Sequence, residues 1–128
     1  MKKQCITAAN APAAVGPYSH AVRAGQFLFV SGQVPIHPDG SGPLRGSVAD
    51  QARLALSNLK AILDEAGAQL DDVVKTTVFI TDMSQFSVVN EVYKEFFKRE
   101  CPARSCVQVA ALPLNVDVEV EAIVLVSA

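Results

Sequence analysis

The chain has 128 residues, of which 50% are hydrophobic and 19% are charged, and its formal net charge is −2 at pH 7. This length fits a single domain, residues 1–128, with a real hydrophobic core. The slightly acidic balance gives no electrostatic attraction to nucleic acid or to an anionic membrane, so neither is expected as the main partner.

The first third of the chain has the pattern of short strands. Clusters of β-branched and aromatic residues predict an edge strand, a second strand and a buried third strand, over Lys3–Thr7, Tyr18–Arg23 and Phe27–Val30. Ser31-Gly32-Gln33 ends the third strand, and Gly32 allows a backbone or a ligand to approach closely. The segment Ile36–Gly46 is expected to be a loop.

The strongest helical pattern runs from Ser47 to Ala66, where apolar residues recur at three- and four-residue steps. Ser47 with Asp50 resembles a capping box, and Gly67 is a natural C-terminal stop.

A β-branched strand is predicted over Val73–Thr81, followed by a second helix from Asp82 to about Arg99. Asn90 lies on the apolar stripe of that helix.

Arg104 stands at the mouth of an apolar strand expected over Val107–Leu112, and Pro102 holds the entry rigid. The nearest acid in the sequence, Glu100, lies beyond the proline. A guanidinium with small apolar neighbours needs a partner from elsewhere, which could be a carboxylate of the protein, a carboxylate ligand, or both. The planar fork of arginine matches a carboxylate bidentately.

The last predicted strand, Val116–Val126, alternates valines on one face with acids on the other. Of these acids we expect Glu121, next to Ile123, to be the most desolvated, with a raised pKa unless a cation offsets it. Arg104 is the candidate cation. A structural ion pair or a solvated strand face would explain the same pattern.

The order of elements is strands, helix, strand, helix, strands, which indicates an α+β domain with two helices on one face of a mixed sheet. The opposite face is rich in β-branched residues, so something must cover it, and self-association is the simplest answer.

The residues offer little other chemistry. Three scattered cysteines and two histidines give no metal-ligand spacing and no Cys-His or Ser-His-acid arrangement, so we expect a reaction without metal or cofactor. Cys106 could be a nucleophile, although a buried small hydrophobe is the commoner role, and His20 is expected to be structural. The free thiols, with no apolar signal segment after Met1, indicate the cytoplasm.

Several motifs, in this order, resemble the RidA family, also called YjgF/YER057c/UK114. The resemblance runs from about Thr7 to Val126. The motifs are Gly16-Pro17-Tyr18-Ser19, Val30-Ser31-Gly32-Gln33, Val74-Lys75-Thr76-Thr77-Val78, Val89-Asn90, Pro102-Ala103-Arg104 and Val120-Glu121-Ala122-Ile123.

The resemblance implies a chorismate-mutase-like fold with a mixed six-stranded sheet. It also implies a homotrimer, in which the sheets form a central barrel and the sites lie in clefts between subunits. The implied reaction is hydrolysis of imines derived from 2-aminoacrylate and 2-aminocrotonate to 2-keto acids and ammonia, without a cofactor. The implied partners are therefore small imino and keto acids.

The resemblance also implies roles for single residues. Arg104 would clamp the substrate carboxylate, and Glu121 would activate water or relay a proton at the imine carbon. Tyr18 would close the cleft. Ser31 would form the wall of the cleft, and backbone groups around Gly32 and Cys106 would orient the substrate. Asn90 would support the site. His20 stands where many relatives have glutamine.

Two alternatives belong to other functional classes. Some relatives have been described as endoribonucleases that inhibit translation, but the acidic balance and the lack of a basic patch argue against nucleic acid as the main partner. The other alternative is a non-catalytic binder of small 2-keto acids that uses the same Arg104 clamp.

Overall fold

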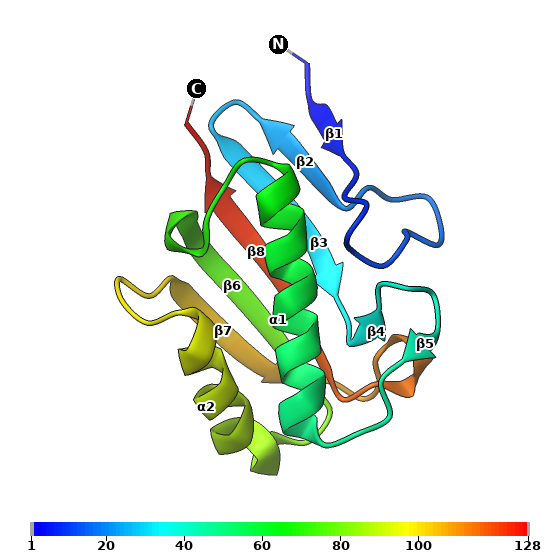
Figure 1. The fold of residues 1–128 in the computed structure, drawn as a ribbon. Coiled ribbons are helices and arrows are strands. Elements are labelled where there is room, and N and C mark those ends of the chain that lie inside the picture. Colours follow the sequence, from blue (N-terminus) through cyan, green and yellow to red (C-terminus); the bar gives the residue numbers. More distant parts are fainter. Residues whose placement is uncertain (1, 128) are drawn as a thin grey trace.

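The computed structural model describes residues 2–127, which form a mixed sheet with both helices on one face (Figure 1). The six strands, in their spatial order, are β1 (Gln4–Ile6), β2 (Ala21–Ala24), β3 (Phe27–Gln33), β8 (Val118–Leu125), β6 (Val73–Ile80) and β7 (Ala103–Gln108). Only the pair β6–β7 is parallel within this sheet of the described chain. The α+β prediction with two helices on one face is confirmed.

A second, two-stranded sheet interrupts the predicted loop after β3. It consists of β4 (Ile36–His37) and β5 (Gly42–Pro43), which pair antiparallel. In Figure 1 the turn after β7 lies beside this small sheet, at the same end of the molecule.

The helix α1 spans Val48–Glu65, within one residue of its predicted bounds at both ends. The Ser47 hydroxyl accepts a hydrogen bond from the Asp50 backbone N–H at 3.1 Å, and Gly67 follows the helix with φ +74°. A left-handed residue is the usual exit from a helix, and glycine adopts it without strain. Local signals therefore set both ends of α1.

The helix α2 spans Phe86–Phe96 and is shorter than predicted at both ends. Residues 83–85 form a 3₁₀ turn capped by Asp82, whose carboxylate accepts from the Ser84 N–H at 3.0 Å. Phe97 is extended, with φ −111° and ψ 90°, so the helix ends before Arg99.

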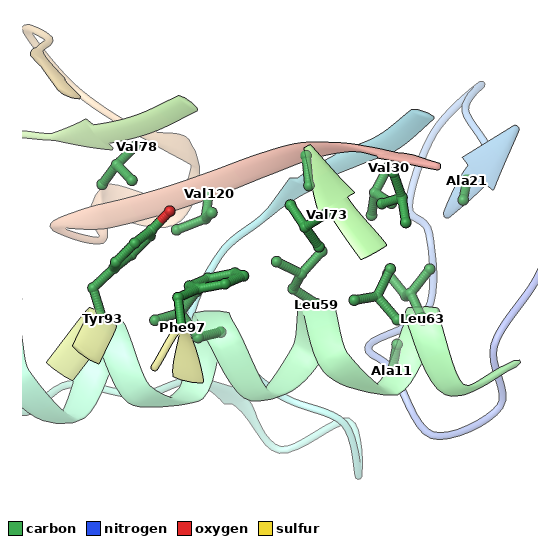
Figure 2. Packing of buried hydrophobic residues seen from close by; sticks show 14 of the residues in the cluster. Ala11, Ala21, Val30, Leu59, Leu63, Val73, Val78, Tyr93, Phe97 and Val120 are labelled. Atoms are coloured by element: carbon green, nitrogen blue, oxygen red, sulfur yellow. The ribbon is translucent and has the colours of Figure 1, made fainter. Parts of the chain in front are cut away.

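The core lies between the sheet and the two helices (Figure 2). Leu59 and Leu63 of α1 point toward the sheet, and Tyr93 of α2 and Phe97, the residue after that helix, lie beside them. The two leucines are fully buried, which stabilises the fold by about 2 kcal/mol for each side chain. The Tyr93 hydroxyl shares a buried 2.8 Å hydrogen bond with Thr76 of β6, which fixes α2 on the sheet.

The sheet face away from the helices carries exposed large hydrophobic side chains. Phe27 and Phe29 of β3 are each 46% exposed and face Leu125 and Ile123 of β8 across the ladder. An apolar patch of this kind on a folded chain marks an interaction surface. The structure thus confirms that one face is covered and the other is open.

Two strand predictions need correction. The strand expected over Val107–Leu112 is β7, which begins at Ala103, so Arg104 lies inside the strand rather than ahead of it. The strand ends at Gln108 because β6, its only neighbour among residues 2–127, ends at Ile80. Tyr18 lies before β2 rather than inside it.

The alternation predicted for the last strand is confirmed. Along β8 the valines are buried under the helices, while the acids point to the open face. Within residues 2–127, no helix has the length and apolar character needed to cross a membrane.

Candidate functional site

A cavity of about 550 Å³ opens where β3 and β8 meet the loop before β2. Tyr18, Ser31 and Gly32, three of the predicted site residues, line it. The third polar side chain, after those of Tyr18 and Ser31, is the Glu119 carboxyl from β8. The remaining lining residues are apolar: Val15, Val34, Ile36, Pro113 and Leu114.

Gly32 makes room for the Glu119 carboxylate. A β-carbon at position 32 would collide with the carboxylate oxygen of Glu119, so any larger residue would displace this carboxylate from its place in the cavity. The ladder between β3 and β8 shifts register between Val30 and Gln33, and Gly32 lies in this irregular stretch. Gly32 therefore meets an acid of this same chain rather than open space.

Hydrogen bonds to β3 hold the segment that carries Tyr18. The Ser31 hydroxyl donates to the Ser19 carbonyl at 2.6 Å, and the Ser31 N–H donates to the His20 carbonyl at 3.0 Å. These bonds fix the backbone next to Tyr18, whose side chain is 49% exposed at the cavity.

His20 has the structural role expected for it. Its side chain is buried, and its Nδ1 accepts from the Ala8 N–H at 2.9 Å. Nε2 lies 2.7 Å from the Pro12 carbonyl, which needs a donor, so the ring carries its proton on Nε2. His20 thereby ties the N-terminal loop to the strand next to the cavity.

Glu119 is the acid with perturbed electrostatics. It is partly buried, and burial raises its pKa above the ordinary value of 4.5, with a smaller contribution from the negative charge of Glu121. Glu121 itself is exposed. The expectation that Glu121 is the most desolvated acid is therefore wrong. The cavity meets β8 at Glu119, two residues nearer the start of the strand.

Arg104 lies with α2 at the other edge of the sheet. Its Nη1 donates to the Asn90 side-chain oxygen at 2.6 Å. Its Cζ lies 4.8 Å from the ring centroid of Tyr93 and 5.3 Å from that of Phe86, both of which attract the guanidinium through the ring faces. Among residues 2–127, no carboxylate lies within ion-pair distance of Arg104.

The expected pairing of Arg104 with Glu121 does not occur within one chain. β7 neighbours β6 rather than β8, so the two residues are not on adjacent strands. Arg104 also pairs with Thr76, which is buried under the helices, whereas Glu121 pairs with Thr77 on the open face. The two side chains therefore point to opposite faces of the sheet.

Cys106 lies two residues beyond Arg104, on the same face, and packs against the core. Burial raises the pKa of its thiol, and the nearby Arg104 lowers it to a smaller extent. The thiol is thus protonated at neutral pH, which disfavours a nucleophilic role. No three His, Cys, Asp or Glu side chains of the described chain converge where they could hold a metal ion.

The predicted site residues thus fall into two groups. The cavity group is Tyr18, Ser31 and Gly32, and the arginine group is Arg104, Asn90 and Cys106. β3 and β7 are separated by β8 and β6, which places the two backbones roughly 14 Å apart. One chain does not bring the two groups together.

Sequence reasoning missed Glu119 and the apolar lining of the cavity. Glu119 and Glu121 share one face of a strand, so their pattern is identical in the sequence. Only the pairing of Gln33 with Val120 shows which of the two acids lies level with Gly32. Val15 and Leu114 come from loops that gave no signal of a shared cavity.

The chain is similar to known proteins over nearly its whole length. Residues 8–126 match the family described as endoribonuclease L-PSP. The chain is 48% identical to the 2-iminobutanoate/2-iminopropanoate deaminase of Escherichia coli K12, covering 92% of this chain and 94% of that protein. It is 49% identical to a RutC family protein of Pyrococcus horikoshii, covering 94% and 96% of the two chains.

Solved structures share the fold. The crystal structure of Escherichia coli TdcF with bound serine superposes with a TM-score of 0.91 at 48% identity, covering 97% of this chain and 99% of that one. The motifs in the sequence, the fold and these relatives agree, and the chain belongs to the RidA (YjgF/YER057c/UK114) family.

Proposed function

We propose that this protein hydrolyses reactive 2-imino acids, formed from enamines such as 2-aminoacrylate and 2-aminocrotonate, to 2-keto acids and ammonia. One observation carries the proposal: Arg104 is held by Asn90 and two aromatic rings, yet no carboxylate of the described chain pairs with it. A rigid guanidinium with free N–H donors is prepared for a carboxylate ligand. The deaminase name of one relative and the serine bound to another support the same class of ligand.

We further propose that the site is completed by a second copy of the chain, within a homotrimer whose sheets form a central barrel. The arginine group of one subunit would face the cavity group of its neighbour. Two observations support this assembly: the groups lie apart within one chain, and the open sheet face is apolar.

In this site Arg104 binds the substrate carboxylate through two parallel N–H donors. Backbone groups at Gly32 and Cys106 orient the substrate, and the Tyr18 hydroxyl hydrogen-bonds the water or the substrate. The enamine first tautomerises to the imine, whose C2 is electrophilic.

Glu119, rather than Glu121, moves the protons. Its raised pKa favours a carboxyl that can donate a proton to the imine nitrogen. Water adds to C2, and the carboxylate takes a proton from the water and passes it to the nitrogen. The proton of the new hydroxyl then returns to the carboxylate as C=O forms and ammonia leaves. One water is consumed, and the C=N bond is replaced by C=O.

The test uses 2-aminoacrylate made in situ from serine by a dehydratase, with pyruvate release followed over time and the remaining imine trapped by semicarbazide. The wild-type protein should accelerate pyruvate release. Arg104→Ala should lower kcat/KM by about a hundredfold or more, because a desolvated charge pair is lost. Arg104→Lys should also lose the acceleration of pyruvate release, because lysine lacks the planar fork that binds a carboxylate through two donors.

Arg53→Ala is the matched control, since Arg53 is an exposed arginine of α1 paired with Glu95 at 2.9 Å. It should keep wild-type activity. If the folded wild-type protein does not accelerate pyruvate release, the deaminase proposal is wrong.

The second candidate is a non-catalytic binder of small 2-keto acids. The lack of a carboxylate partner for Arg104 among residues 2–127 supports this function equally well. Under that reading Arg104→Ala abolishes binding of pyruvate in a titration, while the wild-type protein shows no turnover. An endoribonuclease, as the family description says, would instead cleave RNA in a manner independent of Arg104.

A further inference from the structure

The cavity that holds Glu119 has more apolar wall than a methyl-bearing imino acid needs. Val15 is 82% exposed and Leu114 is 55% exposed, so two large aliphatic side chains of the cavity face water. Val34 and Ile36 add to the same wall from the segment after β3. A volume of about 550 Å³ is within the range of roughly 300–1,000 Å³ that small-molecule sites occupy.

Leu114 is held in a conformation that leucine disfavours. Its φ is 57° and its ψ is 20°, in the left-handed region that glycine and asparagine adopt more readily. The 3₁₀ turn Pro113–Asn115 fixes this geometry, with the Asn115 N–H donating to the Leu112 carbonyl at 3.0 Å. The side chain gains little burial in return, so stability does not explain a leucine here.

We propose that Leu114, with Val15, forms the subsite for the aliphatic side chain of the substrate. This subsite favours 2-imino acids with side chains of two or more carbons over the methyl-bearing 2-iminopropanoate. The proposal rests on the proposed function and names the substrate class of that same site. The acid and the apolar wall line one cavity, so a substrate whose C2 lies at Glu119 can extend its side chain along Leu114.

The size of the preference follows from apolar burial. Each methylene removed from water favours binding by about fourfold. Because the wall is partly open, we expect the kcat/KM for a leucine-derived imine to exceed that for 2-iminopropanoate by only about tenfold.

The experiment compares two imines made in situ: 2-iminopropanoate from serine by a dehydratase, and the leucine-derived imine from leucine by an amino-acid oxidase with catalase. Leu114→Asn is the main variant, because asparagine adopts the left-handed region and has a similar size. The ratio of kcat/KM for the leucine-derived imine over 2-iminopropanoate should fall about three- to tenfold in this variant.

Val88→Asn is the matched control, because Val88 is an exposed valine of α2 outside the cavity. Its ratio should equal that of the wild type. An unchanged ratio in a folded Leu114→Asn protein overturns the proposal. So does a Leu114→Asn protein that loses activity on both imines because its assembly dissociates in sedimentation velocity, since Leu114 then serves assembly.

A titration with 2-keto acids of increasing side-chain length separates this proposal from the reaction itself. Kd should fall with chain length for the wild type and change much less for Leu114→Asn. If the wild-type protein turns over neither imine, the deaminase proposal fails, while this titration still decides the role of Leu114.

Discussion

Glu119 and Glu121 lie two residues apart on one face of β8, yet their surroundings differ. Glu119 lines the cavity next to Gly32 and is partly buried, whereas Glu121 is exposed and acts on Glu119 only through its charge. The two acids therefore form a natural pair of variant and control.

We predict that Glu119→Gln lowers kcat for imine hydrolysis by about a hundredfold, because a positioned acid–base group contributes at least that much. Glu121→Gln should stay within about threefold of wild type. Stopped-flow measurement of imine decay gives both values. Binding of pyruvate should survive in both variants, since Arg104 is intact. A larger loss in Glu121→Gln than in Glu119→Gln would return the acid–base role to Glu121.

For single residues, the sequence predicts that Arg104 needs a partner, but it does not predict which acid of β8 lines the cavity. An arginine with no nearby acid indicates a missing partner, and no acid of the described chain pairs with it. The choice between two acids on one strand face required the register with β3, which depends on an irregularity near Gly32 that the sequence does not specify.

At the scale of elements, amide side chains connect α1 to the strands that border the cavity. Asn58 is 2% exposed and donates to the carbonyls of Val34 and Ile36 at 3.1 and 2.9 Å. These two carbonyls belong to the segment after β3 that forms part of the cavity wall. Near the start of the helix, Gln51 bonds both the backbone N–H and the carboxylate of Asp117 at 2.8 Å.

We predict that Asn58→Leu destabilises the protein by about 3 kcal/mol, because a side chain of similar size leaves two buried carbonyls without a donor. Urea unfolding followed by circular dichroism measures the loss. Ser57→Leu, at the neighbouring exposed position of α1, should change stability by no more than about 0.5 kcal/mol. A cost below about 1 kcal/mol for Asn58→Leu would show that water replaces the amide.

The elements differ in how well the sequence predicts them. α1 is predicted within one residue because Ser47 and Gly67 act locally on its ends. The end of β7 at Gln108 depends on where β6 stops, which is a long-range property, whereas its first residue, Ala103, lies opposite Lys75 inside β6. The aromatic ring of Tyr18 fits the pattern of a strand, yet β2 starts only at Ala21, because the ring does not by itself pair the backbone at position 18 with β3.

At the scale of the whole molecule, the layered fold leaves one side of the sheet without a cover. Helices bury one face, while Phe27, Phe29 and Leu125 form an apolar surface on the other. Since the core beneath the helices is complete, a single chain can remain folded when this surface is changed.

We predict that Phe29→Lys shifts the protein from an assembly to single chains, because a lysine on this face places a charge in an apolar interface. Sedimentation velocity measures the change, and circular dichroism checks that the chain stays folded. Imine hydrolysis should fall together with assembly. Met83→Lys, at an exposed site before α2, is the control and should leave the assembly intact. An unaltered sedimentation coefficient for Phe29→Lys would contradict the proposal that subunits associate through the open face of the sheet.

The separation of the arginine group from the cavity group has a consequence for inheritance. If each site combines Arg104 of one subunit with Glu119 of the next, a chain without Arg104 and a chain without Glu119 carry different defects. In any mixed ring of the two, one interface unites the intact arginine of one chain with the intact acid of the other. Two inactive alleles expressed in one cell would then complement each other, although neither variant forms an active site alone.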